Sequence, residues 1–125
     1  MQKETETPLI LTVDDDAVVV NFIERLLRRE GFRVIKASDG VDAVSQVRDN
    51  NPDLILLDIN MPGPDGILTL ERIREISKAP VIMLTGLDND KYLKASFDKG
   101  ADDFINKPFR PADLITRINA ILNRT

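Results

Sequence analysis

Residues 54 to 66 read L-I-L-L-D-I-N-M-P-G-P-D-G, an apolar run that ends on a carboxylate and continues into a loop rich in proline and glycine. The run 54–58 has the length of a strand and carries no polar residue before Asp58. Such continuous apolar strands are typical of parallel sheets, whose two faces are both covered by helices. The stretch therefore predicts a buried parallel strand. It leaves open whether Asp58 belongs to a turn or to a chemical site.

Short apolar runs alternate with helix-period segments along the rest of the chain. Further strands are expected at 9–13, 32–37, 81–85 and 104–105. Helices are expected at 17–30, 40–50, after a cap at or near Asp65, at 88–99, and from Pro111 to about residue 122. Five such strand–helix units predict a parallel sheet with helices on both faces and right-handed crossovers.

Each expected helix carries apolar residues at the spacing of one helix face. Gly31 is expected to end the first helix, and Pro111 fits the first position of the last one. The expected core-facing residues are Val19, Phe22, Ile23, Leu26 and Leu27 in the first helix, Val41, Val44 and Val47 in the second, Ile67, Leu70, Ile73 and Ile76 in the third, and Leu114, Ile115, Ile118, Ile121 and Leu122 in the last.

The composition limits the class of protein. The 125 residues suit one domain, expected at 8–125 after a flexible tail at 1–7. A net charge of -4 argues against direct nucleic-acid binding, which depends on cationic contacts to phosphates. No apolar stretch approaches the roughly 20 residues of a membrane span, so no membrane insertion is expected. The absence of cysteine and of a secretory signal suits a cytoplasmic protein.

The absence of histidine and cysteine also excludes a Ser-His-Asp triad, a cysteine nucleophile and an ordinary zinc site. Polar residues instead follow the expected strands. Asp14, Asp15 and Asp16 follow the first strand, Asp58 ends the third, Thr85 ends the fourth, and Lys107 follows the fifth. Ligand sites of open parallel sheets lie at the carboxyl ends of strands, so these groups are expected together.

Each of these residues taken alone also fits a turn, a helix cap or a solvated surface. Together, several carboxylates would repel one another and raise their pKa values unless a cation lies between them. Oxygen ligands of this charge suit Mg²⁺. A carboxylate beside Mg²⁺ and a lysine can accept a phosphoryl group, because the cations neutralise the charge that gathers on its oxygens.

Four short motifs carry a resemblance to a known family: V-D-D-D (13–16), D-I-N-M-P-G-P-D-G (58–66), L-T-G (84–86) and K-P-F (107–109). In this order and on these elements, the chain resembles the receiver domain of two-component response regulators from about residue 8 to 122. The resemblance implies a flavodoxin-like, three-layer α/β/α fold with strand order 2-1-3-4-5. It also implies phosphoryl transfer from a sensor histidine kinase or histidine phosphotransfer protein.

The same resemblance implies a role for each site residue. Asp58 would be the phosphoacceptor, and Lys107 would pair first with Asp58 and then with the phosphoryl oxygens. Thr85 would hydrogen-bond the phosphoryl group, and Phe104 would occupy the position of the switch aromatic. The implied Mg²⁺ ligands are Asp14, Asp15, Asp58 and the backbone carbonyl of Asn60. Such a domain catalyses its own phosphorylation and dephosphorylation and does not act on free substrates.

Four further features follow from the resemblance. The bond between Lys107 and Pro108 would be cis. The first helix, with Arg25, Arg28 and Arg29, would meet the kinase or phosphotransfer domain unless it is only a solvated face. The face formed by residues 88–122 would serve output or a phosphorylation-dependent homodimer. Asn60 and Leu87 would flank the attacking water, and Leu87 cannot orient it, so rapid autodephosphorylation assisted from that position is not expected.

Two other functions are compatible with parts of this pattern. A Mg²⁺-dependent phosphohydrolase of the haloacid dehalogenase type would need a second aspartate two residues after Asp58, where this chain has Asn60. A phosphorylation-independent interaction module of receiver type would usually lack an acidic, threonine or lysine element, and all of these are present. Treatment with a small phosphodonor and Mg²⁺ distinguishes the three.

Overall fold

The computed structural model describes residues 7–59, 66–86 and 90–123, and strands alternate with helices through all of them. The strands are β1 (Leu9–Val13), β2 (Arg33–Ala37), β3 (Leu54–Asp58), β4 (Val81–Thr85) and β5 (Asp103–Asn106). The helices are α1 (Ala17–Arg29), α2 (Gly40–Asn50), α3 (Gly66–Arg74), α4 (Asp90–Asp98) and α5 (Pro111–Leu122). None of the helices in this part of the chain is long and apolar enough to cross a bilayer.

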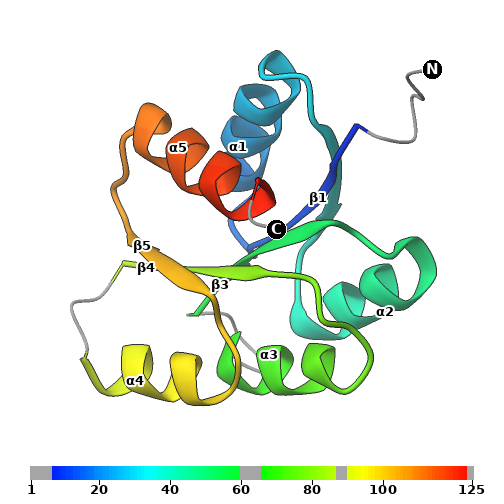
Figure 1. Cartoon of the computed structure of the whole chain (residues 1–125), viewed down its shortest axis with the longest axis vertical. Helices are drawn as coiled ribbons and strands as arrows, with labels where there is room; N and C mark the ends of the chain where they lie inside the picture. Colours follow the sequence, from blue (N-terminus) through cyan, green and yellow to red (C-terminus); the bar gives the residue numbers. More distant parts are fainter. Residues whose placement is uncertain (1–6, 60–65, 87–89, 124–125) are drawn as a thin grey trace.

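The strands form one parallel sheet in the order β2-β1-β3-β4-β5 (Figure 1). Helices α1 and α5 cover one face of the sheet, and α2, α3 and α4 cover the other (Figure 1). The predicted strand order and three layers are therefore confirmed. The central strand β3 is buried at every position, which explains why its sequence is apolar up to its last residue.

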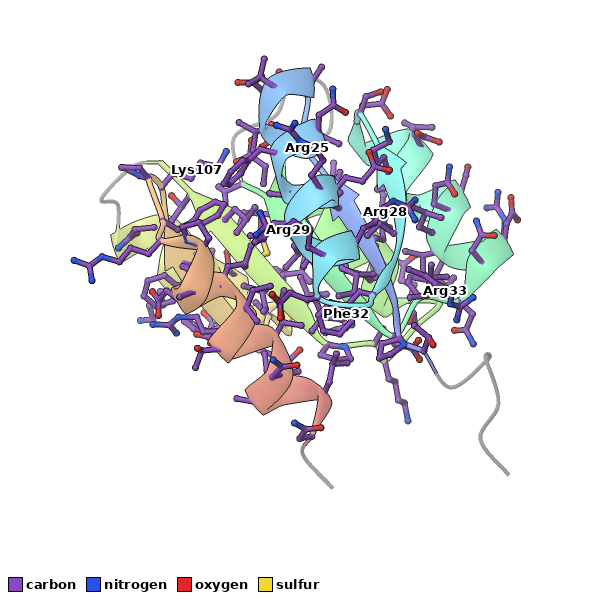
Figure 2. The ribbon with its side chains drawn as sticks, turned by 90° about the horizontal axis from the view of Figure 1, so that it is seen from above. Arg25, Arg28, Arg29, Phe32, Arg33 and Lys107 are labelled. Carbon is purple, nitrogen blue, oxygen red and sulfur yellow. The ribbon has the colours of Figure 1, made fainter. Side chains whose placement is uncertain are left out.

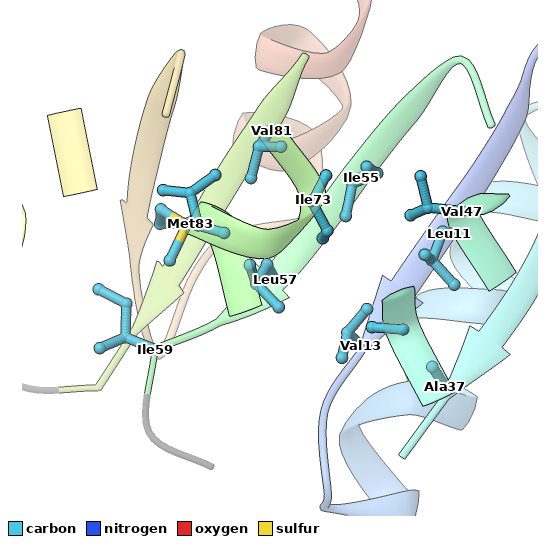
Figure 3. Close-up of a cluster of buried hydrophobic side chains, with 12 residues drawn as sticks. Leu11, Val13, Ala37, Val47, Ile55, Leu57, Ile59, Ile73, Val81 and Met83 are labelled. Atoms are coloured by element: carbon cyan, nitrogen blue, oxygen red, sulfur yellow. The ribbon is translucent and has the colours of Figure 1, made fainter. Parts of the chain in front are cut away.

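The hydrophobic core has two halves, because successive strand residues point to opposite faces of the sheet. The half between the sheet and α2 and α3 includes Leu11, Val13, Ile55, Leu57, Val81 and Met83 (Figure 3). The half beneath α1 and α5 includes Ile10, Leu54, Leu56, Ile82, Leu84 and Ile105. Burying each such side chain stabilises the fold by about 2 kcal/mol, so these two clusters hold the strand ends in place.

Most of the predicted core-facing residues of α1 and α2 do pack on the sheet: Ile23, Leu27 and Val47 are buried, and Val19, Leu26 and Val44 pack against the core. In α1 the buried residues are Val20, Ile23 and Leu27, whereas Phe22 is 42% exposed. In α2, Val41 is 66% exposed. The prediction missed Val20, one of three consecutive valines after Ala17, and it missed Gly40 and Ala43 of α2, which are small residues that a search for large apolar side chains overlooks. The predicted stripe of α5 is confirmed.

Several predicted boundaries also move by a few residues. Helix α1 ends at Arg29 and not at residue 30, and Phe32 precedes β2 because its N–H donates to the Leu27 carbonyl in the helix-ending turn. Gly31 adopts a φ of 93°, the left-handed conformation expected of a helix-ending glycine. Helix α3 ends at Arg74, so Ile76 lies beyond it and is 48% exposed.

Two predictions about helix starts have different outcomes. Pro111 begins α5, as expected. The proposed cap at Asp65 lies outside the described residues, although α3 does begin at Gly66. The expected N-terminal tail also lies almost entirely outside the described part of the chain.

Candidate functional site

The carboxyl ends of four strands meet at one edge of the sheet. Strand β3 ends at Asp58 and β4 at Thr85, while Asp14 follows β1 and Lys107 follows β5. The parallel register between these strands sets their ends beside one another. The Lys107 N–H donates to the Thr85 carbonyl at 2.7 Å, so the β4 backbone positions the lysine. The peptide bond between Lys107 and Pro108 is cis, as predicted.

Lys107 bridges two buried carboxylates. Its Nζ lies 3.0 Å from Asp14 Oδ2 and 3.4 Å from Asp58 Oδ1. The two aspartate side chains are 1% and 5% exposed, whereas the lysine side chain is 24% exposed. Pairing with Asp58 was predicted, but the shorter contact to Asp14 was not. One ammonium group therefore compensates two carboxylates that water barely reaches.

The pKa of Lys107 reflects two opposing effects. Burial lowers the pKa, but the hydrogen bond to Asp14 and the charges of Asp58 and Asp14 outweigh burial and raise it above the usual lysine value. Lys107 is therefore an ammonium ion throughout the physiological pH range. It can pair with an anion at this site but cannot act there as a base.

Asp14, Asp15 and Asp58 form a group that could hold a divalent cation. One carboxylate oxygen from each lies within 4.8 Å of the others, with Asp14 and Asp58 buried and Asp15 exposed. An all-oxygen set of high negative charge, open to solvent on one side, fits Mg²⁺, which retains several water ligands. The fourth predicted ligand, the carbonyl of Asn60, lies outside the described residues.

Asp16, the third member of the acidic run, has a structural role. Its side chain accepts a hydrogen bond from the Val18 N–H at 2.9 Å and caps the N-terminus of α1. The Asp16 N–H donates to Asp14 Oδ1 at 3.0 Å, which orients the Asp14 carboxylate toward Lys107 and Asp58. The expectation of a helix cap in this acidic run is thus confirmed for Asp16, while Asp14 and Asp15 remain candidates for the site.

Thr85 ends β4 at the site, and Phe104 lies on the neighbouring strand β5. Thr85 is 2% exposed. Phe104 is partly buried against the core, and its ring meets Phe97 of α4 edge to face at 5.9 Å between centroids. Phe97 itself is 45% exposed. The predicted switch aromatic therefore packs beneath a solvent-exposed ring of α4.

Gly66 begins helix α3 directly beside the end of β3. A Cβ at this position would overlap the carbonyl oxygen of Asp58 and would lie 2.6 Å from the Cα of Ile59. Helix α3 thus begins directly against the end of β3. Only glycine permits this approach, and a prediction based on turn preferences has no means of detecting it.

A groove of about 800 Å³ lies beside Lys107 and was not predicted. Helix α1 contributes Val18, Phe22 and Arg25 to its lining, and the segment after β5 contributes Lys107 and Phe109. The ring centroids of Phe22 and Phe109 lie 6.5 Å apart. The sequence signal for this groove was Val18, an apolar residue in the first turn of α1 that lies outside the predicted core face.

Comparisons with known proteins agree with this geometry. A family model described as "Response regulator receiver domain" matches residues 10–119. The transcriptional regulatory protein YvrH of Bacillus subtilis (strain 168) is 42% identical over 121 residues, which are 96% of this chain and 51% of that protein. The DNA-binding response regulator MtrA of Mycobacterium tuberculosis (strain ATCC 25618 / H37Rv) is 40% identical over 121 residues, 97% of this chain and 53% of that protein. The chain thus spans about half the length of these relatives.

Solved structures show the same similarity. A CheY-like response regulator receiver domain protein from Methanospirillum hungatei JF-1 superposes with a TM-score of 0.92 at 29% identity, covering 94% of this chain and 95% of that one. The receiver domain of NtrX from Brucella abortus superposes with a TM-score of 0.87 at 32% identity, covering 93% of this chain and 99% of that one.

Proposed function

Because the chain belongs to the family of response regulator receiver domains, we propose that it is a switch that accepts a phosphoryl group on Asp58. The donor is a phosphohistidine of a sensor histidine kinase or of a histidine phosphotransfer protein. This chain has no histidine and so cannot supply the donor itself. One observation carries the proposal: the buried Asp58 carboxylate lies 3.4 Å from the Lys107 ammonium at the edge of the sheet where ligands bind.

In the proposed reaction, an oxygen of Asp58 forms a bond to phosphorus while the phosphorus–nitrogen bond of the phosphohistidine breaks. The electron pair of the broken bond returns to the imidazole nitrogen of the donor. Lys107 remains protonated and pairs with an oxygen of the transferred phosphoryl group. Asp14, Asp15 and Asp58, with the carbonyl of Asn60, would hold Mg²⁺, which when bound supplies positive charge for the phosphoryl oxygens.

We further propose that phosphorylation changes the surface of α4, β5 and α5. The added phosphoryl group carries about -1.5 to -2 charges at neutral pH, and it would attract the Thr85 hydroxyl and Lys107. The contact between Phe104 and the exposed ring of Phe97 supports a path from the site to this surface. On the same surface, Arg117 pairs with Asp103 at 3.0 Å. A phosphorylation-dependent homodimer through residues 88–122 is part of this proposal.

Incubation with phosphoramidate and Mg²⁺, followed by intact-mass measurement, tests the function. The chain should gain one phosphoryl group, which is labile to hydroxylamine, and Asp58→Asn should abolish the gain. Continuous release of phosphate from many equivalents of donor would instead indicate a phosphohydrolase. No mass gain at all would indicate a phosphorylation-independent module.

The matched variants Asp15→Asn and Asp16→Asn test the assignment of the metal ligands. Asp15→Asn should slow phosphorylation and weaken its dependence on Mg²⁺, because one carboxylate ligand is lost. Asp16→Asn should retain the wild-type rate, since asparagine caps a helix as well as aspartate does. Equal effects of the two substitutions would contradict the assignment of Asp15 as a ligand.

A further inference from the structure

A hollow between helices α2 and α3 lies apart from the candidate site. It has a volume of about 150 Å³ and is lined by Gly40, Val41, Val44, Ser45, Arg48 and Arg72. All of these residues belong to α2 except Arg72, which comes from α3. The two helices pack side by side on the same face of the sheet (Figure 1). We call this feature the α2–α3 hollow.

The surface around the α2–α3 hollow is apolar. Gly40 is buried and Val44 packs against the core, so these two residues form its floor. Val41, in the first turn of α2, is 66% exposed. On α3, Leu68 is 38% exposed and lies one helical turn before Arg72. Exposed apolar side chains that gather beside a hollow, and are not scattered singly, are typical of surfaces that contact another molecule.

Two arginines at the hollow have little compensation for their charge. Arg72 forms no ion pair with any side chain that the structure describes. Arg48 lies 3.6 Å from its exposed sequence neighbour Asp49, a separation too long for a hydrogen bond, and its Nη2 donates to Ser45 Oγ at 3.4 Å. By contrast, Arg74 donates to two backbone carbonyls and pairs with a carboxylate. In a chain with a net charge of -4, two such arginines side by side favour an acidic partner.

We propose that the α2–α3 hollow is the docking site of an acidic segment of a partner protein, which inserts one aromatic side chain into the hollow and presents carboxylates to Arg48 and Arg72. The volume fits this occupant, because a cavity of about 150 Å³ accommodates a benzene ring. Aromatic side chains held in pockets are common anchors of protein interfaces. The planar guanidinium groups of arginine also pack favourably against aromatic rings.

The spacing along α2 limits where the partner's carboxylates lie. Val41, Val44 and Arg48 follow one another at intervals of three and four residues, which places them along one side of the helix. At about 1.5 Å per residue, Arg48 is roughly 6 Å beyond Val44 and roughly 10 Å beyond Val41. An extended segment rises about 3.3 Å per residue. The carboxylates are therefore expected two or three residues from the aromatic side chain.

The α2–α3 hollow is separate from the surfaces that the proposed function uses. None of its lining residues belongs to α1, to residues 88–122 or to the candidate site. The inference goes beyond the proposed function and is tested on the unphosphorylated chain. Failure of peptide binding is therefore distinguishable from failure of phosphoramidate labelling.

Three fluorescently labelled synthetic peptides of equal length test the inference with the full chain by fluorescence anisotropy. The first carries one phenylalanine with glutamates two and three residues away on each side. The second has alanine in place of the phenylalanine, and the third has lysines in place of the glutamates. The first peptide should bind, more weakly at high salt. Loss of the aromatic anchor should weaken binding about tenfold or more, and the lysine peptide should not bind.

Matched variants of the chain locate the bound peptide. Arg72→Gln should weaken binding of the first peptide about three- to fivefold, the effect expected of one exposed ion pair. Val41→Asp should abolish binding, because it places a carboxylate at the apolar rim. Arg29→Gln is the control, because Arg29 is also an exposed arginine in the last turn of a helix. Arg29 lies on the α5 side of α1 (Figure 2), over the opposite face of the sheet, so its loss should change binding by less than about twofold.

Several outcomes would overturn the inference. They are no binding of the first peptide up to about 1 mM, equal binding of the first and third peptides, an equal loss from Arg29→Gln, and peptide-shifted amide NMR signals that lie outside residues 40–48 and 68–72. Phe97, which Asp98 follows, is an exposed aromatic residue of this chain beside a carboxylate. Self-association of the unphosphorylated chain that both Phe97→Ser and Val41→Asp abolish would also overturn the inference, because it would assign the hollow to a second copy.

Discussion

The positive charge of Lys107 pairs with both buried carboxylates of the site. This lysine comes from a loop 93 positions away from Asp14 in the sequence, yet its ammonium group lies within 3.4 Å of both buried carboxylates. Breaking a buried ion pair by removing one partner is more harmful than losing an exposed one, because an uncompensated charge remains. The lysine thus has a structural role before any phosphoryl group arrives.

The raised pKa of Lys107 predicts a specific loss of stability in alkali. Because its folded-state pKa exceeds the unfolded value, the protonated lysine favours the folded state below about pH 10.4. This contribution should be lost as the pH rises through the folded-state pKa. The free energy of unfolding of the wild-type chain, measured by urea titration, should therefore decline between pH 8 and about pH 11.5.

Two variants isolate the contribution of this one lysine. Lys107→Met should be less stable than the wild-type chain at pH 8, and the difference should narrow at high pH. Lys78→Met, at an exposed position, should follow the wild-type curve. A constant difference between Lys107→Met and the wild-type chain across this range would mean that the ion pairs do not stabilise the fold.

At the scale of elements, the start of α3 is set by the end of β3. Gly66 lies so close to the Asp58 carbonyl that a side chain cannot be accommodated there. The other end of α3 is also anchored, because Arg74 donates to the carbonyls of Ala79 and Gly100 at 2.6 and 2.9 Å. Helix α3 is therefore attached both to the strand that ends at Asp58 and to the turn after α4.

Gly66→Ala should destabilise the chain by about 1–3 kcal/mol, since the added methyl group must displace backbone atoms of the site strand. Gly86→Ala is the matched control, because a Cβ there would meet nothing within 4 Å. The free energy of unfolding from urea titrations measures both. Equal free energies of unfolding for the two variants would contradict this, because they would show that the start of α3 can shift at no energetic cost.

At the scale of the whole molecule, two surfaces lie on different sides of the site. The groove beside Lys107 is lined by Val18 and Phe22 of α1, whereas Phe97 of α4 and the ring of Phe104 lie on the opposite face of the sheet. Under the proposed function, the part of the readout surface around Phe97 and Phe104 is therefore separate from this groove, whereas Phe109, which also lies within residues 88–122, lines the groove.

Phosphorylation should convert the chain to a dimer through residues 88–122, as seen by sedimentation velocity before and after phosphoramidate treatment. Phe97→Asp should prevent dimerisation but not labelling, because its side chain is exposed on α4. Val41→Asp places the same charge at an exposed position of α2, outside residues 88–122, and should leave the dimer intact. Dimerisation by the Phe97→Asp variant would exclude α4 from the interface.

The sequence by itself determined the order of the strands and helices, and it indicated the four strand ends that carry Asp14, Asp58, Thr85 and Lys107. These features are local: a strand buried on both faces must be apolar throughout, and polar residues at its end are evident in the sequence. Tertiary structure alone decided that Lys107 lies closer to Asp14 than to Asp58. It also decided which side of α1 is buried, because consecutive apolar residues allow more than one helical stripe and only the position of the sheet selects among them. The groove beside Lys107 follows from that selection, since packing α1 through Val20, Ile23 and Leu27 leaves Val18 and Phe22 exposed to solvent.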